Sequence, residues 1–210
     1  MKRYIGIVLL TVSILSCKGQ ANSNIEKHVG GPCEDCEAVF DFKLLNPEPK
    51  ATDTLPGFEN NEPKIKITGT VFQKDGKTPA ENIVLYIYHT NSNGIYKPSN
   101  NPIGYEKKHG QYREWLKTGK DGKFAFYTFI PAPYPAGNEP GHIHIYVKEP
   151  NTIPYYLDSY LFENDPKLTP EERQSQKNRG GSGIVTIEKN NGIWTANRNL
   201  VLGLNVPDYE

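Results

Sequence analysis

The chain has 210 residues, with 24 basic and 24 acidic side chains and a formal net charge of zero. This length suits one domain of ordinary size, and the lack of a basic block argues against a nucleic-acid partner. The sequence is rich in tyrosine (13), proline (17) and glycine (19). This mix favours strands, turns and long ordered loops over helices.

The N-terminus has the features of an export signal. Lys2 and Arg3 form a charged start, and residues 5–15 are an apolar run that is too short to span a membrane as a mature helix. Residues 14–17, Ile-Leu-Ser-Cys, resemble the lipobox of bacterial lipoproteins, in which the cysteine becomes the lipid-modified N-terminus. We expect residues 1–16 to be a signal peptide, and Cys17 to anchor an exported protein on the periplasmic side of a membrane. An ordinary signal peptide with an incidental cysteine is the alternative.

The segment after the signal connects it to the domain. Residues 17–30 are small and polar and predict a tether, and residues 31–63 predict an N-terminal arm that wraps the domain. The arm contains Cys33 and Cys36. In an oxidising compartment a local disulfide is the first interpretation, with free thiols as the alternative. No second cysteine pair is present to complete a four-thiolate zinc site.

Residues 64–210 predict the folded domain. Residues 64–72 alternate apolar and polar side chains, as a half-buried strand does. Residues 111–118 and 123–130 are expected to pair across the turn 119–122. One capping box with proline at its first position, Thr169-Pro170-Glu171-Glu172, predicts one short helix near 169–177. Further strands are predicted at 82–90, 142–148, 155–162 and, as a hairpin, 183–202. The predicted fold class is all-β, an antiparallel β-sandwich with long loops.

Two histidines in the predicted strand 142–148 carry the functional signal. His142 and His144 are two positions apart, so their imidazoles face the same side of the sheet. They are either metal ligands or polar positions of a half-buried strand. Tyr134 precedes them in a Pro-rich turn, and Tyr96 lies in the loop after strand 82–90. A phenol with a pKa of about 10 becomes a ligand when a hard trivalent cation replaces its proton. Two tyrosines and two histidines therefore point to Fe(III).

In this order of motifs the sequence resembles the intradiol ring-cleavage dioxygenases, which open catechols with O2 at a non-haem Fe(III) site. The resemblance covers about residues 64–163. It implies that Tyr96, Tyr134, His142 and His144 hold the iron, that the substrate displaces Tyr134, and that the product is of the muconate type. The motifs are Tyr88-His89-Thr90-Asn91, Gly94-Ile95-Tyr96, Thr118-Gly119-Lys120-Asp121-Gly122, Pro131-Ala132-Pro133-Tyr134-Pro135 and His142-Ile143-His144.

One position departs from the family pattern. The better-known family members have an arginine three residues before the first histidine, where it can stabilise negative charge that develops on the substrate; here the residue is Glu139. Arg113 and Arg179 are the candidates for a replacement catalytic cation, although each could also be an ordinary structural arginine. His89 stands in the place of a family glutamine, as a pocket wall or a partner of the ligands. His28 and His109 are expected to be solvated loop residues.

Two other functions are compatible with this sequence. One is a non-catalytic β-sandwich lipoprotein that binds a ligand and has a degenerate metal site, which Glu139 favours. The other is a copper or zinc protein that uses the two histidines. The sequence leaves the particular catechol and the oligomeric state open, with a homo-oligomer among the options.

Overall fold

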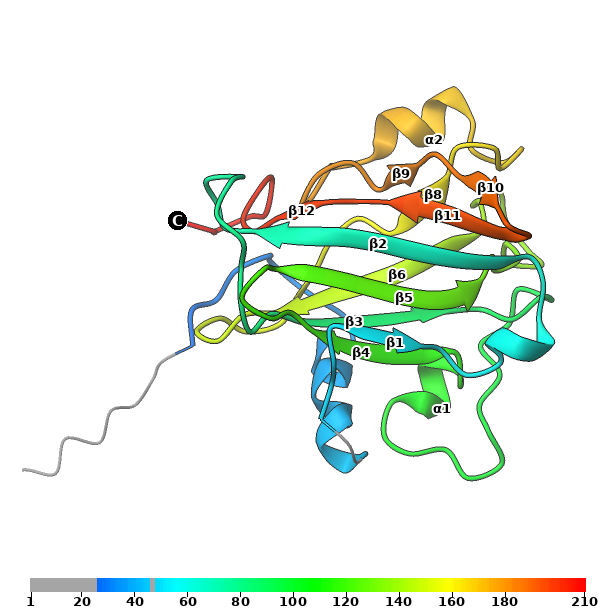
Figure 1. Cartoon of the computed structure of the whole chain (residues 1–210), viewed down its shortest axis with the longest axis horizontal. Helices are drawn as coiled ribbons and strands as arrows, with labels where there is room; N and C mark the ends of the chain where they lie inside the picture. The colour runs from blue at the N-terminus through cyan, green and yellow to red at the C-terminus, as the bar shows by residue number, and fades with distance from the viewer. Residues whose placement is uncertain (1–25, 46–47) are drawn as a thin grey trace, which may run out of the picture.

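The computed structural model describes residues 26–45 and 48–210 of the chain. The expected signal peptide and Cys17 lie outside these residues. Within them, no helix is both long enough and apolar enough to cross a bilayer. Two sheets stack face to face, and Figure 1 shows the sheet that contains β2 and β5 in front of the sheet that contains β3, β4 and β6. The prediction of a β-sandwich is confirmed.

The first sheet is built around the long strand β2 and its antiparallel partner β5. The strands follow the order β1, β5, β2, β11, β10, and β12 also pairs with β2. The pairs β1–β5, β11–β2 and β12–β2 are parallel, whereas β2–β5 and β10–β11 are antiparallel. This sheet is therefore mixed, and not purely antiparallel as predicted. The bounds are β1 (Thr52–Thr54), β2 (Lys64–Phe72), β5 (Lys123–Phe129), β10 (Glu188–Asn190), β11 (Ile193–Asn197) and β12 (Leu200–Val201).

The second sheet carries the predicted histidine strand. Its order is β4, β3, β6, β8, β9, with β7 also paired to β6. The central pairs β3–β4 and β3–β6 are antiparallel, and β8–β9 is parallel. The predicted strand 155–162 is divided into β7 and β8. The bounds are β3 (Val84–His89), β4 (Arg113–Lys117), β6 (His142–Lys148), β7 (Tyr155–Tyr156), β8 (Tyr160–Phe162) and β9 (Ile184–Val185).

The expected pairing of residues 111–118 with 123–130 is wrong. At the turn 119–122 the chain crosses from one sheet to the other, so β4 pairs with β3 and β5 pairs with β2. Leu116 on β4 and Phe126 on β5 are fully buried in the same core between the sheets. Because the two strands belong to opposite sheets, they cover this core from opposite sides.

Side-chain alternation gives the second sheet two apolar faces. Ile143, Ile145 and Val147 of β6 point into the core between the sheets, and His142, His144 and Tyr146 therefore point to the outer face. A second cluster covers this outer face and includes Tyr86 and Tyr88 of β3, Trp115 of β4 and Tyr146 of β6. Because both faces are buried, every residue of β3 is buried.

Among residues 26–45 and 48–210, four short helices lie around the sandwich. The 3-10 helix η1 (Cys36–Leu44) packs on the outer face of the second sheet and buries Ala38 and Val39 completely, so this part of the predicted arm contributes to a core. The others are η2 (Phe58–Asn60), α1 (Glu106–His109) and α2 (Pro170–Ser175). The predicted helix is α2, and the Thr169 hydroxyl caps it by accepting the backbone N–H of Glu172.

Candidate metal centre

The two histidines of β6 face the outer side of the second sheet, close to the tyrosine-rich cluster. His144 lies directly opposite Tyr88 in the ladder between β3 and β6. Both histidine side chains are half-buried. The strand pattern therefore directs two imidazoles to one place, as the spacing of two residues predicts.

Tyr96 and Tyr134 come from two loops that are tied to each other. The Thr90 hydroxyl donates to the carbonyl of Ala132 at 2.8 Å, and the backbone N–H of Ala132 donates to the carbonyl of Asn91 at 3.3 Å. Gly94 adopts φ of 73°, and a Cβ there would clash with the backbone of Pro133. Only glycine allows this close approach at that φ, which brings the two phenols together.

Four donor atoms of these residues converge. The Tyr96 hydroxyl lies 2.6 Å from the Tyr134 hydroxyl and 2.8 Å from His144 Nε2. His144 Nε2 lies 3.4 Å from the Tyr134 hydroxyl and 3.1 Å from His142 Nε2. A metal with bonds of about 2.0–2.1 Å sets neighbouring ligands roughly 2.8–3.4 Å apart. The spacing of the four donors therefore fits one metal ion.

The protonation states of the imidazoles also suit metal binding. His142 Nδ1 lies 2.8 Å from the carbonyl of Pro140. A carbonyl can only accept, so Nδ1 carries the proton and Nε2 presents its lone pair. Burial, and then the charge of His142, lowers the pKa of His144 well below its ordinary value. His144 is therefore available as a neutral nitrogen ligand, and His142 turns its Nε2 toward the same point.

The phenols discriminate between metals. Burial is the main cause that raises the pKa of Tyr96 and of Tyr134, so each stays protonated unless a strong cation replaces its proton. Within residues 26–45 and 48–210, no group of three or more His, Cys, Asp and Glu side chains is arranged to hold a metal. Binding at this place would depend on the two phenolate oxygens, and hard anionic oxygen suits Fe(III) better than Zn(II) or Cu(II).

A stack of rings supports His144 from behind. The Tyr88 ring lies between the rings of His144 and His109, with centroid distances of 4.4 and 4.0 Å. The Tyr88 hydroxyl lies 2.8 Å from the Tyr146 hydroxyl. The expectation that His109 is solvated is wrong: it is 5 % exposed, and burial lowers its pKa to about 4. His28 is exposed, as expected.

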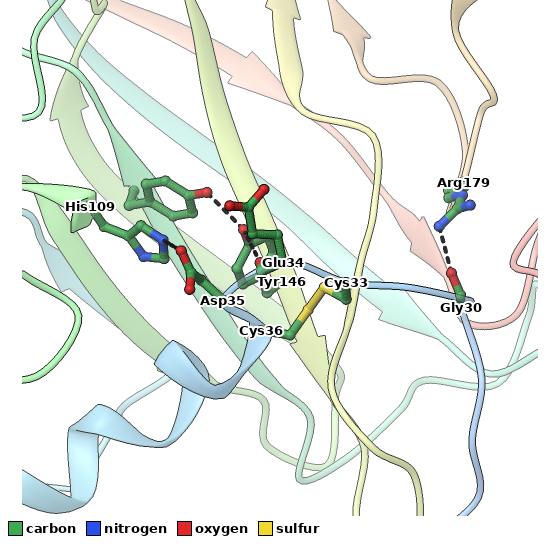
Figure 2. Close-up of a disulfide and its surroundings, with 9 residues drawn as sticks. Gly30, Cys33, Glu34, Asp35, Cys36, His109, Tyr146 and Arg179 are labelled. Carbon is green, nitrogen blue, oxygen red and sulfur yellow. Dashed lines mark hydrogen bonds and ion pairs between the residues drawn. A yellow bond between two sulfur atoms is a disulfide. The ribbon is translucent and has the colours of Figure 1, made fainter.

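The N-terminal segment completes this support. Cys33 and Cys36 form a disulfide, which resolves the choice between disulfide and free thiols. Figure 2 shows the turn between them directing Glu34 and Asp35 toward Tyr146 and His109. The Glu34 carbonyl accepts from the Tyr146 hydroxyl at 3.0 Å, and an Asp35 carboxylate oxygen lies 3.7 Å from His109 Nε2.

His89 is a structural residue of the sheet. It is fully buried, and its ring nitrogens lie 2.7 Å from the Thr90 carbonyl and 2.6 Å from the Thr128 hydroxyl. The carbonyl accepts from Nδ1, so Nε2 accepts from the hydroxyl of Thr128. Burial lowers the pKa of His89 to about 4. His89 thus joins the two sheets close to the start of the Tyr96 loop.

Arg113 and Arg179 do not join the four donors. Arg113 is 4 % exposed, and its guanidinium donates to the Asp41 carboxylate at 2.7 Å and the Ile103 carbonyl at 2.6 Å. A guanidinium held in this way cannot contact a substrate, so the predicted catalytic role of Arg113 is wrong. Arg179 donates to the Gly30 carbonyl at 3.0 Å, as Figure 2 shows, and stacks 4.0 Å from the Tyr156 ring centroid. It reaches the site only through that ring.

A cavity of about 370 Å³ opens beside the two histidines. Glu139 lines it, together with Glu172 of the predicted capping box and with residues that the sequence analysis did not single out, among them Tyr156, Asp158 and Lys177. A second cavity of about 380 Å³ shares His144 and Tyr156 and reaches the disulfide turn. Residues 156–177 carry no catalytic or metal-binding motif, and the packing of β7, β8 and α2 against β6 brings them here.

The fold and the converging tyrosine and histidine donors define the class of this protein, a β-sandwich dioxygenase domain. The family model described as Dioxygenase matches residues 46–180. The chain belongs to the intradiol ring-cleavage dioxygenase family.

Known relatives agree with this assignment. Catechol 1,2-dioxygenase 1 of Acinetobacter lwoffii is 34% identical over 120 residues, which are 50% of this chain and 37% of that protein. The dioxygenase domain of a dioxygenase–carbohydrate-binding protein fusion from the cellulolytic bacterium Streptomyces sp. SirexAA-E has a TM-score of 0.56 at 18% identity, covering 75% of this chain and 91% of that one. Catechol 1,2-dioxygenase from Acinetobacter sp. ADP1, inhibited by bound mercury, has a TM-score of 0.54 at 20% identity, covering 74% and 57%. The chain spans half or less of the length of the first curated relatives it matches.

Proposed function

We propose that this chain is a non-haem Fe(III) intradiol dioxygenase that cleaves a catechol-type diol with O2 to a muconate-type product. One observation carries this proposal: four donor atoms converge, and each lies within 3.4 Å of at least one other. They are the hydroxyls of Tyr96 and Tyr134 and the Nε2 atoms of His142 and His144. Relatives named as catechol and chlorocatechol 1,2-dioxygenases support the substrate class.

The donor residues have separate tasks in this proposal. When bound, ferric iron would withdraw electrons from the diol and make its ring reactive toward O2. Tyr96, His142 and His144 remain as ligands throughout. Tyr134 is half-buried and directly precedes the exposed residues 135–139, so it could leave when the diol binds. Its phenolate oxygen would take one of the two diol protons, and a hydroxide from solvent would take the other. Both oxygen atoms of O2 enter the product, and no external reductant is needed.

Iron binding and ring cleavage are tested together. The full chain, purified in mild detergent and loaded with ferric iron, is expected to be red-brown from tyrosinate charge transfer and to consume O2 with catechol. Tyr96→Phe should weaken the visible band and lower the rate, whereas Tyr127→Phe, in the other sheet, should change neither. A colourless protein without iron would contradict the proposal and favour a binding module with a degenerate site. Zinc or copper bound at one ion per chain would instead favour a copper or zinc protein that uses the two histidines.

The place of action is a separate proposal. We propose that Cys17 anchors the protein to the periplasmic side of a bacterial membrane, because residues 1–17 have the charge, apolar run and lipobox of a lipoprotein signal. Labelled fatty acid should be incorporated into the wild type and not into Cys17→Ala. Labelling that persists in this variant would contradict the anchor.

A further inference from the structure

A carboxylate borders the cavity beside the two histidines at a position where better-known family members have a cationic arginine. Glu139 lines the cavity beside His142 and His144, at the position where the family has an arginine. The side chain is exposed and has no ion pair or hydrogen bond with any other described residue.

The rest of the cavity does not supply a compensating excess of cations. Glu172, on the first turn of α2, lines the same cavity and accepts a hydrogen bond from Gln176 at 2.9 Å. Asp158 also lines it; its carboxylate accepts the backbone N–H of Asn178, and it lies near the buried guanidinium of Arg198. Lys177 is the one cationic side chain on the lining.

The two arginines that could have reversed this balance are held elsewhere. Arg113 is buried against Asp41, and Arg179 lies behind the ring of Tyr156. A diol that binds at the two histidines would therefore place its ring substituent in this cavity, where carboxylates outnumber cations. A volume of about 370 Å³ accommodates an aromatic ring with a short substituent.

We propose that this site selects catechols by the charge of the ring substituent, favouring a cationic substituent and disfavouring a carboxylate, with Glu139 as the specificity-determining residue. This inference rests on the proposed function, because it assumes that a diol binds at the two histidines. A unit charge about 6 Å from Glu139 in a partly wet cavity changes affinity roughly tenfold. A cationic and a carboxylated substituent are shifted in opposite directions, so the ratio of their affinities is expected to be roughly a hundredfold.

The experiment uses three catechols that differ in the para substituent: 4-methylcatechol, 4-(aminomethyl)catechol and 3,4-dihydroxybenzoate. Binding to the iron-loaded full chain is measured without O2 by calorimetry, and cleavage is measured by O2 uptake. All affinities are divided by that of 4-methylcatechol for the same variant, so that general effects on folding or iron content cancel. The wild type should bind the amine most tightly and the carboxylate most weakly.

Variants at position 139 test the residue itself. Glu139→Gln should reduce the ratio of amine to carboxylate affinity roughly a hundredfold, because the effect on both ligands is lost, and Glu139→Arg should reverse the preference. Glu81→Gln, an exposed glutamate outside the cavity lining, should leave the ratio unchanged. Added salt should shrink the wild-type ratio, because the effect is electrostatic.

The outcomes separate the two proposals. If 4-methylcatechol is cleaved but the amine and the carboxylate bind equally well, or if Glu139→Gln leaves their ratio unchanged, the charge selection is overturned and the dioxygenase function stands. If none of the three diols binds or is cleaved, the proposed function fails, and the substrate inference fails with it.

Discussion

The ring of Tyr88 stacks on the ring of His144, with centroids 4.4 Å apart and planes 14° from parallel. The two residues are direct cross-strand partners of β3 and β6. A ligand histidine needs a fixed ring plane, and its outer partners control this plane. The Tyr88 ring is therefore expected to fix the ring plane of His144. His109 packs on the opposite face of the Tyr88 ring.

Removing the Tyr88 ring should weaken the metal centre. Tyr88→Leu is expected to lower iron affinity about 10- to 100-fold, the usual range for outer partners of metal ligands. Tyr88→Phe keeps the stacked ring and loses only the hydrogen bond to Tyr146, so it should lower affinity much less. Competition with a chelator measures both variants. Equal losses in the two would show that the hydroxyl, and not the ring, supports His144.

Arg113 should act on stability and not on substrate. Arg113→Met leaves the buried Asp41 carboxylate without its partner, and loss of one member of a buried pair costs about 3–5 kcal/mol. Asp41→Asn added to Arg113→Met keeps an acceptor for the backbone N–H of Tyr105 and should recover part of this loss. Urea unfolding measures the free energies. A folded Arg113→Met with normal stability and a lost reaction rate would restore the catalytic role.

The disulfide should contribute modestly to stability. It closes a loop of four residues, for which the chain-entropy relation gives about 2 kcal/mol. Cys33→Ala combined with Cys36→Ala should lower the free energy of unfolding by that amount, and reduction of the wild type should have the same effect. Reducing agent should leave the double variant unchanged. An unchanged wild-type midpoint after complete reduction would contradict this prediction.

His89 should make stability depend on pH. Burial lowers the pKa of His89 from 6.5 to about 4. Between these pH values His89 is therefore protonated in the unfolded chain and neutral in the folded chain. Stability should therefore fall as the pH decreases from about 6.5 to about 4, by on the order of 3 kcal/mol in total, and this contribution should level off below pH 4. His89→Gln retains a donor for Thr90 and an acceptor for Thr128. Unfolding at several pH values should show a smaller slope in this variant, and an equal slope would exclude His89 as the cause.

Local patterns determined much of the architecture and part of the site. Alternation in residues 64–72 and 142–148 predicts β2 and β6 with their observed bounds, because a strand that covers a core must alternate. The same period of two places His142 and His144 on one face. The capping box at Thr169 predicts α2, since the interactions that start a helix lie within four residues.

Only the tertiary structure decided the long-range partners. The turn 119–122 suits a hairpin equally well, and the shared core between the sheets makes it a crossover. The sequence around Arg113 gives no sign of an ion-pair partner. In the fold, η1 places Asp41, 72 residues away in sequence, against its guanidinium. The residues that line the cavity beside His142 and His144, from Glu139 to Lys177, meet through the packing of β7, β8 and α2 against β6. Contacts between segments far apart in sequence depend on the whole fold, and no local period encodes them.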